Sequence, residues 1–127
     1  MKRLSLSIII SLLAFPSFAQ NPEVELLVKP YLQDAEPNSI KVRWETSAGE
    51  ESIVEWGLTP KLGQKSHGLA EGMNFGDNRL HTVKIESLKR FTNYYYRIKT
   101  GKVVSDIYQF KTPPFASDRQ SFNIVAM

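Results

Sequence analysis

Residues 40–45 read Ile40-Lys41-Val42-Arg43-Trp44-Glu45, a strict alternation of apolar and charged side chains. In an extended strand successive side chains point to opposite faces, so this stretch places its apolar side chains on one face and its charges on the other. Such a strand is half-buried, with the apolar face against a core. The stretch therefore predicts a sheet with one covered face, and Trp44 is predicted to be a core residue.

The same period of two recurs on both sides of this stretch, and no helical periodicity comes between the repeats. Five further segments are predicted to be strands, over residues 24–28, 52–56, 82–86, 94–98 and 106–110. Turn-forming residues separate several of them, as at Pro37-Asn38 and Thr59-Pro60. Six short strands without helices predict an all-β fold, an antiparallel sandwich in which two sheets bury their inner faces against each other.

Residues 61–80 interrupt this pattern, because they contain four glycines and no sustained alternation. We expect a long loop there, with one irregular edge strand near residues 73–75. Further along, Pro113-Pro114 ends the last strand, since proline has no N–H to donate to a sheet ladder. The sandwich domain is therefore predicted to span residues 20–114.

Residues 1–19 have the three parts of a secretory signal: a charged start at Lys2 and Arg3, an apolar middle, and a small-x-small exit at Ser17-Phe18-Ala19. The apolar run covers 12 positions, whereas a transmembrane helix needs about 20. The alternative, an uncleaved anchor, is disfavoured because Pro16 would break its helix. We expect cleavage after Ala19, a secreted or periplasmic protein, and no stable membrane anchor.

The C-terminal residues change character after the two prolines. Residues 115–121 are predicted to be a linker, and residues 122–127 read Phe-Asn-Ile-Val-Ala-Met. A nearly all-apolar run of this kind is typical of a strand buried on both faces in a parallel sheet. Because nothing upstream supplies such a sheet, residues 122–127 are predicted to begin a second, truncated α/β domain.

Length and charge limit the function classes. A chain of 127 residues can hold one ordinary domain. Its net charge of +3 falls to +1 without Lys2 and Arg3, which leaves 14 basic against 13 acidic residues. A chain so close to neutral gives no electrostatic case for nucleic-acid binding, and the absence of cysteine excludes disulfides and thiolate metal sites.

The sequence lacks motifs that would carry chemistry. Its two histidines, His67 and His81, have no neighbours at metal-ligand spacing and are predicted to be structural. Gly63 and Gly68 have the spacing of a phosphate loop, but leucine and alanine follow where lysine and serine or threonine are needed. We therefore predict no catalytic, cofactor-binding or metal-ligating residue in this chain.

The run Tyr94-Tyr95-Tyr96 is a further candidate, as a platform for stacking sugars or bases. Alternation places Tyr94 and Tyr96 in the core and leaves Tyr95 on the surface with Arg97 and Lys99. Stacking surfaces use several exposed aromatic side chains, so a single one is weak evidence for such a site.

Residues 88–94 resemble the Leu-x-Pro-x-Thr-x-Tyr turn of fibronectin type III domains, with Leu88, Thr92 and Tyr94 in place and Arg90 replacing the proline. The resemblance implies that the Tyr94 hydroxyl bonds back to the backbone of the preceding corner.

A more specific resemblance covers residues 30–114. The segments that carry it are Lys29-Pro30-Tyr31-Leu32-Gln33, residues 41–46, residues 52–57, His81-Thr82-Val83, Tyr94-Tyr95-Tyr96-Arg97 and residues 108–113. In this order they resemble the N-terminal domain of bacterial purple acid phosphatases and related secreted metallophosphoesterases. The resemblance implies a fibronectin type III-like sandwich that precedes a catalytic domain with a dinuclear centre of iron with iron, zinc or manganese, which presents a hydroxide to a phosphate ester.

None of that centre's ligands maps onto this chain. The resemblance thus implies an accessory module whose partner is its own C-terminal catalytic domain and which meets a phosphate ester only through that domain. Two other readings remain open: a stand-alone secreted fibronectin type III-like module that binds a protein or glycan, and a structural spacer in a larger surface protein. Residues 122–127 favour the first reading, because a finished sandwich does not need a strand of a second domain.

Overall fold

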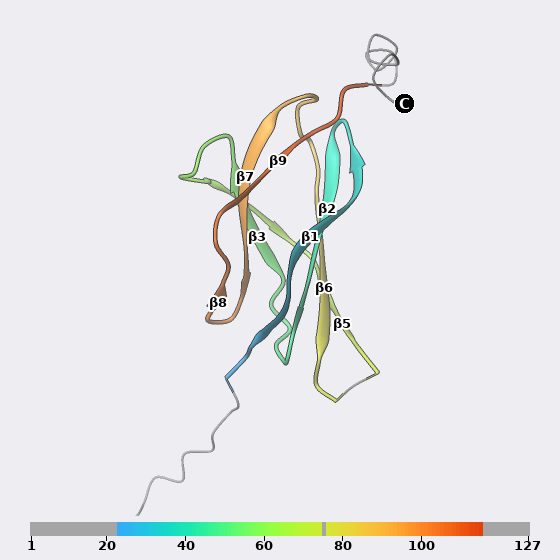
Figure 1. Ribbon diagram of the computed structural model, residues 1–127, viewed down its shortest axis with the longest axis vertical. Coiled ribbons are helices and arrows are strands. Elements are labelled where there is room, and N and C mark those ends of the chain that lie inside the picture. The colour runs from blue at the N-terminus through green and yellow to red at the C-terminus, as the bar shows by residue number, and fades with distance from the viewer. Residues whose placement is uncertain (1–22, 75, 116–127) are drawn as a thin grey trace, which may run out of the picture.

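The structure, a computed structural model, describes residues 23–115 except residue 75. These residues form nine strands and no helix (Figure 1). The strands are β1 (Leu26–Glu36), β2 (Ser39–Thr46), β3 (Ile53–Gly57), β4 (Gln64–His67), β5 (Leu69–Gly72), β6 (Arg79–Ile85), β7 (Asn93–Thr100), β8 (Val103–Val104) and β9 (Tyr108–Lys111). The expected leader over residues 1–19, most of the linker and the segment 122–127 lie outside the described residues.

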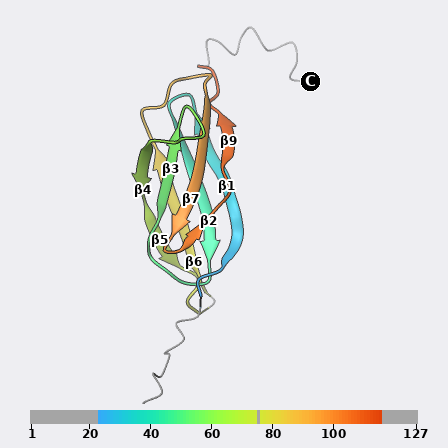
Figure 2. The same ribbon diagram turned by 90° about the vertical axis from the view of Figure 1, so that its left-hand side faces the viewer.

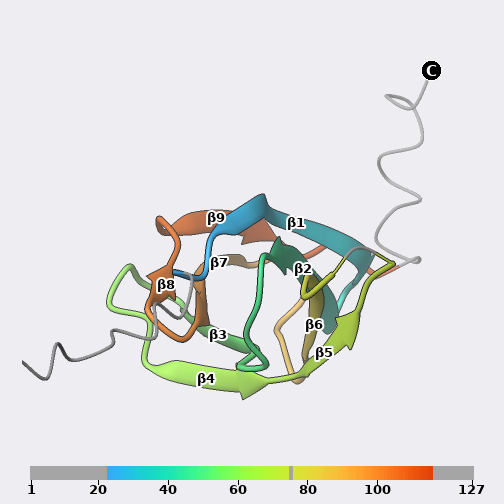
Figure 3. The ribbon, with the colours of Figure 1, turned by 90° about the horizontal axis from the view of Figure 1, so that it is seen from below.

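The strands form two antiparallel sheets that face each other. One sheet has the order β1-β2-β6-β5, and the other has the order β4-β3-β7, with β8 and β9 both paired to β7. Seen end-on, β1 lies beside β9 at one seam, and the chain passes from β4 to β5 at the other (Figures 2 and 3). The predicted antiparallel β-sandwich is confirmed.

The first strand is longer than the expected strand over residues 24–28. The pairing of β1 with β2 shifts register between Leu26 and Val28 and again between Val28 and Tyr31. Each shift adds a residue to β1, which interrupts the alternation that sequence reasoning relies on. Pro30 fits within β1 because an edge strand need not donate every N–H.

The expectation for residues 61–80 is wrong in part, because they contain β4 and β5. These consecutive strands are edges of opposite sheets, so most of their side chains are exposed and leave no apolar alternation. Met73 and Asn74 lie outside any strand. The change of sheet occurs at Gly68, where a Cβ atom would overlap the carbonyl oxygen of Thr82. Only glycine permits so close an approach between two backbones.

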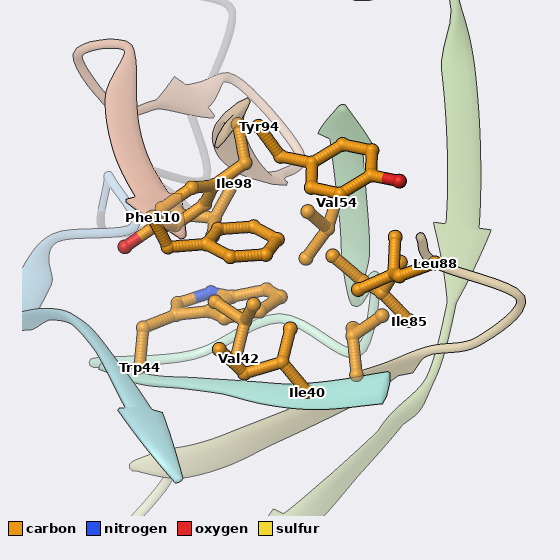
Figure 4. Packing of buried hydrophobic residues seen from close by; sticks show 11 residues of the cluster. Ile40, Val42, Trp44, Val54, Ile85, Leu88, Tyr94, Ile98 and Phe110 are labelled. Atoms are coloured by element: carbon orange, nitrogen blue, oxygen red, sulfur yellow. The ribbon is translucent and has the colours of Figure 1, made fainter. Parts of the chain in front are cut away.

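The core lies between the sheets and contains the predicted face of β2. The β2 side chains meet those of β3, β7 and β9 across the interior (Figure 4). The buried apolar residues are Ile40, Val42, Trp44, Val54, Val83, Ile85, Leu88, Tyr94, Tyr96, Ile98 and Phe110. Trp44 is fully buried and Tyr94 is 3% exposed, so both predicted core positions are confirmed.

The turn before β7 forms the predicted tyrosine corner. The backbone N–H of Lys89 donates a hydrogen bond of 2.7 Å to the Tyr94 hydroxyl, which points toward Leu88 in Figure 4. Leu88 is buried beneath the turn. We call residues 86–92, between β6 and β7, the corner loop. Arginine in place of the usual proline at position 90 does not prevent the corner from forming.

Candidate functional site

His81 lies inside the sandwich on β6. Its ring is fully buried and stacks on Trp44, with the ring centroids 5.0 Å apart. Both ring nitrogens have partners, because Nε2 lies 2.7 Å from Thr46 Oγ1 and Nδ1 lies 2.7 Å from Ser52 Oγ. Both nitrogens and one face of the His81 ring therefore contact other residues of the domain.

Burial and the lengths of its hydrogen bonds favour a neutral His81 ring. The Thr46 hydroxyl donates to the Ala48 carbonyl oxygen at 2.8 Å, so it accepts from the imidazole Nε2–H. The Ser52 hydroxyl has two acceptors within reach, His81 Nδ1 at 2.7 Å and the Glu50 carbonyl oxygen at 3.3 Å, and it donates along the shorter contact to Nδ1. This arrangement requires a neutral ring, and burial lowers the pKa of His81 below its ordinary value. His81 therefore has no lone pair available to a metal ion or substrate.

The other histidine lies outside this cluster. His67 is exposed at the end of β4, in register with Ile53 of β3. In the described part of the chain, no group of three or more His, Asp or Glu side chains is placed to hold a metal ion. Among the same residues, no helix is long and apolar enough to cross a membrane.

The three consecutive tyrosines divide as alternation predicts. Tyr94 and Tyr96 are buried, and burial raises the pKa of Tyr96 to about 12. Tyr95 is half-buried on the outer face of β7. The neighbouring Arg97 is engaged by Glu55, whose Oε2 lies 2.6 Å from Nη2 and 2.7 Å from Nε. The outer face therefore presents a cross-strand ion pair beside one partly covered aromatic ring.

The chain leaves the sandwich along a fixed path after β9. Thr112 is buried, and its hydroxyl donates to the Lys89 carbonyl oxygen at 2.6 Å and accepts from the Thr92 N–H at 2.9 Å. Its own N–H donates to the Thr92 carbonyl oxygen at 3.0 Å. We call residues 112–115 the exit segment. Thr112 attaches the exit segment to the corner loop, a role that a lone threonine before two prolines does not reveal in the sequence.

A groove of about 330 Å³ is lined in part by the corner loop. Its walls come from the end of β3, the turn after it and the corner loop, and include Trp56, Leu58, Leu62, Lys89 and Tyr94. The Trp56 and Tyr94 rings meet edge to face at 5.8 Å. Leu58, which is 54% exposed, is thus accessible in this groove beside the half-buried Trp56, whereas the Tyr94 ring forms part of its floor.

Two facing antiparallel sheets with a tyrosine corner define this domain as a fibronectin type III-like module. Residues 28–112 match the family model described as "Purple acid Phosphatase, N-terminal domain". The chain therefore belongs to the family of purple acid phosphatase N-terminal domains, as its sequence motifs predict.

The solved structures with a similar fold include the sensor domain of the anti-sigma factor RsgI4 in Pseudobacteroides cellulosolvens. Its long form is 15% identical, with a TM-score of 0.53 over 72% of this chain and 91% of that chain. Its short form is 14% identical, with a TM-score of 0.51 over 75% of this chain and 99% of that chain. At these identities the likeness shows the fold alone. No curated protein matches the sequence.

Proposed function

We propose that this chain is the non-catalytic N-terminal module of a secreted metallophosphoesterase of the purple acid phosphatase type. The observation that carries the proposal is the family match over residues 28–112. A phosphatase N-terminal domain implies a catalytic domain that follows it in the parent protein. Metal-dependent hydrolysis of phosphomonoesters is then the activity of that second domain, whose metals supply the attacking hydroxide.

Two sequence features support the secreted, two-domain form of this proposal. Residues 1–19 have the pattern of a cleaved signal, and residues 122–127 have the pattern of a strand buried in a parallel sheet. The geometry of His81 supports a non-catalytic role for the module, because both of its nitrogens are bonded inside the core. The dinuclear centre is therefore assigned to the domain after the linker.

The coding sequence beyond codon 127 tests the two-domain arrangement. We expect an aspartate within a few residues, followed by Gly-Asp and Gly-Asn-His motifs that supply the metal ligands. A stop codon would contradict the proposal and favour a stand-alone binding module.

An activity assay tests whether phosphate ester hydrolysis requires the second domain. The 127-residue chain, purified with iron, zinc or manganese, should not hydrolyse an aryl phosphate above background between acid and neutral pH, whereas the longer protein should. Metal-dependent turnover by the short chain that is lost in His67→Gln or His81→Gln would overturn the proposal.

Secretion has its own test. Mass spectrometry of the protein recovered from the periplasm or medium should give an N-terminus at Gln20, because the small-x-small exit ends at Ala19. An intact Met1 would contradict cleavage without affecting the assignment of the sandwich.

A further inference from the structure

His81 is bonded to both ends of the loop that joins β2 to β3. Its Nε2 lies 2.7 Å from Oγ1 of Thr46, the last residue of β2, and its Nδ1 lies 2.7 Å from Oγ of Ser52, which directly precedes β3. We call residues 47–51 the β2–β3 loop. Since β2 and β3 belong to opposite sheets, this loop carries the chain from one sheet to the other. A buried ring on β6 therefore holds the two points where the loop begins and ends.

The same two hydroxyl groups contact carbonyl oxygens inside the β2–β3 loop. Thr46 Oγ1 lies 2.8 Å from the Ala48 carbonyl oxygen, and Ser52 Oγ lies 3.3 Å from the Glu50 carbonyl oxygen. A hydroxyl has one proton to donate and can also accept. The Thr46 hydroxyl donates to Ala48 and accepts from the Nε2–H of His81, whatever the charge of the ring. The Ser52 proton, in contrast, has two acceptors, and the charge of the ring determines which one it uses.

Protonation of His81 changes only the bond to Ser52. The neutral ring has a lone pair on Nδ1, which accepts from the Ser52 hydroxyl. The protonated ring has an N–H at both nitrogens, so Nδ1 donates to Ser52 Oγ and the Ser52 proton turns to the Glu50 carbonyl oxygen. The step takes one proton from solvent, breaks one hydrogen bond and forms two. Every buried donor keeps an acceptor, which is the condition for holding a charge inside a fold.

The charged groups that act on the His81 ring oppose each other. Burial lowers the pKa of His81 most, the Glu50 carboxylate raises it, and Arg79 on β6 lowers it. Glu50 and Arg79 are themselves an ion pair, with 2.7 Å between Oε1 and Nε. Trp44, which stacks on the ring, and Ala70, its cross-strand partner on β5, are uncharged, as are the two hydroxyl residues. Charging the ring is therefore opposed mainly by burial, and the additional hydrogen bond of the protonated form offsets part of that penalty.

The β2–β3 loop is bonded to two further segments. The Glu25 N–H, before β1, donates to the Ser47 hydroxyl at 2.8 Å, and the Ser47 N–H donates to the Glu25 carbonyl oxygen at 2.9 Å. In the turn between β7 and β8, the Gly101 N–H donates to Glu51 Oε1 at 3.1 Å. A bond to the Glu50 carbonyl restrains the peptide group that it shares with the Glu51 amide. The state of His81 thus acts on a loop that contacts both the start of the sandwich and the β7–β8 turn.

We propose that His81 and Ser52 form a proton-sensitive switch in which the Ser52 hydroxyl donates to His81 when the ring is neutral and to the Glu50 carbonyl oxygen when the ring is protonated, while the domain stays folded. Protonation then adds a restraint to the β2–β3 loop. The switch compares two folded forms, whereas the stability of the domain compares a folded with an unfolded form, so a less stable protonated form is compatible with it. The proposal concerns the sandwich alone and does not require a following domain.

Nuclear magnetic resonance of the 15N-labelled 127-residue chain tests the switch as the pH is lowered from 8. At pH 8 the His81 nitrogen shifts should report a proton on Nε2 alone, and at lower pH Nδ1 should become protonated while the domain keeps one folded set of signals. The Glu51 amide, which shares a peptide group with the Glu50 carbonyl, should shift with the same midpoint. A proton on Nδ1 alone at pH 8, or a ring that stays neutral until unfolded signals appear, would overturn the proposal.

Substitutions of Ser52 separate the switch from simple titration of a histidine. Ser52→Ala removes a charge-assisted bond from the protonated form and an ordinary bond from the neutral form, so the His81 midpoint should fall by about one pH unit. The Glu51 amide should then no longer follow His81, whereas Ser52→Thr, which retains the hydroxyl, should preserve the coupling. Ser39→Ala removes a hydroxyl from a residue 6% exposed at the start of β2 and is the matched control, with no change expected. Equal coupling of Glu51 to His81 in wild type and Ser52→Ala would overturn the role of Ser52.

Discussion

The Trp44 indole lies parallel to the His81 imidazole, with 5.0 Å between the ring centroids and 8° between the ring planes. The two residues are direct cross-strand neighbours on β2 and β6. Trp44 also reaches the opposite sheet, where its Nε1–H donates to Thr100 Oγ1 at 2.9 Å. One aromatic pair therefore joins two strands within a sheet and connects the two sheets across the core.

Stability should depend on pH through His81. Burial lowers the pKa of its ring, so the folded state binds the proton less readily than the unfolded state does. The full contribution is present above about pH 6.5, the ordinary pKa of histidine, and is lost as the pH falls below that value toward the lower folded pKa. Urea unfolding at pH 8 and pH 5 measures this loss.

Two histidine variants separate the contribution of His81 to this pH dependence from that of other groups. His81→Gln should remove most of the decrease in stability between pH 7 and pH 5, whereas His67→Gln, at an exposed position, should retain it. The same decrease in wild type and His81→Gln would show that other groups are responsible.

Replacing Trp44 by alanine should destabilise the domain strongly. The substitution removes a fully buried ring and its hydrogen bond to Thr100, and loss of a large aromatic from a core costs about 3–5 kcal/mol. Denaturant unfolding measures the change, with Leu69→Ala on exposed β5 as a control expected to stay within about 0.5 kcal/mol. A loss below about 1 kcal/mol would contradict the role of this ring in joining the sheets.

Removing the hydroxyl of the tyrosine corner should have a smaller effect. Tyr94→Phe deletes the acceptor of the Lys89 N–H and retains the buried ring, so the free energy of unfolding should fall by roughly 0.5–1.5 kcal/mol. Tyr95→Phe, on the partly exposed outer face, is the matched control and should leave stability nearly unchanged. Equal effects of the two substitutions would show that the corner bond does not contribute.

A side chain at position 68, where the chain changes sheet, should lower the stability of the domain. Gly68→Ala introduces a Cβ that overlaps the Thr82 carbonyl oxygen, and such overpacking costs about 1–3 kcal/mol. Gly72→Ala is the control, because its nearest neighbour would be Arg79 Nη1 at 3.8 Å, an ordinary contact. Thermal or denaturant melts that rank the two variants equally would contradict the argument from backbone approach.

Strands with one buried face were predictable from the sequence, whereas edges and irregular strands were not. Ile40, Val42 and Trp44 alternate because β2 lies between β1 and β6 with one face on the core. The bulges of β1 and the exposed edges β4 and β5 suppress the same signal. Thr112 attaches the exit segment to the corner loop through hydrogen bonds to residues 20 and 23 positions earlier in the chain. A pattern of neighbouring residues in the sequence cannot indicate such distant partners.

The described chain enters the sandwich at one end and leaves it at the other, before β1 and after β9 (Figure 1). Tension applied between these two points acts along the strands, which also run from end to end. The ladders that join β1 to β2 and β9 to β7 then carry the load in shear, so their hydrogen bonds must break together instead of opening one by one. Residues 23 and 115 therefore lie at opposite ends of the strands, in the geometry in which a pair of antiparallel sheets resists extension most strongly.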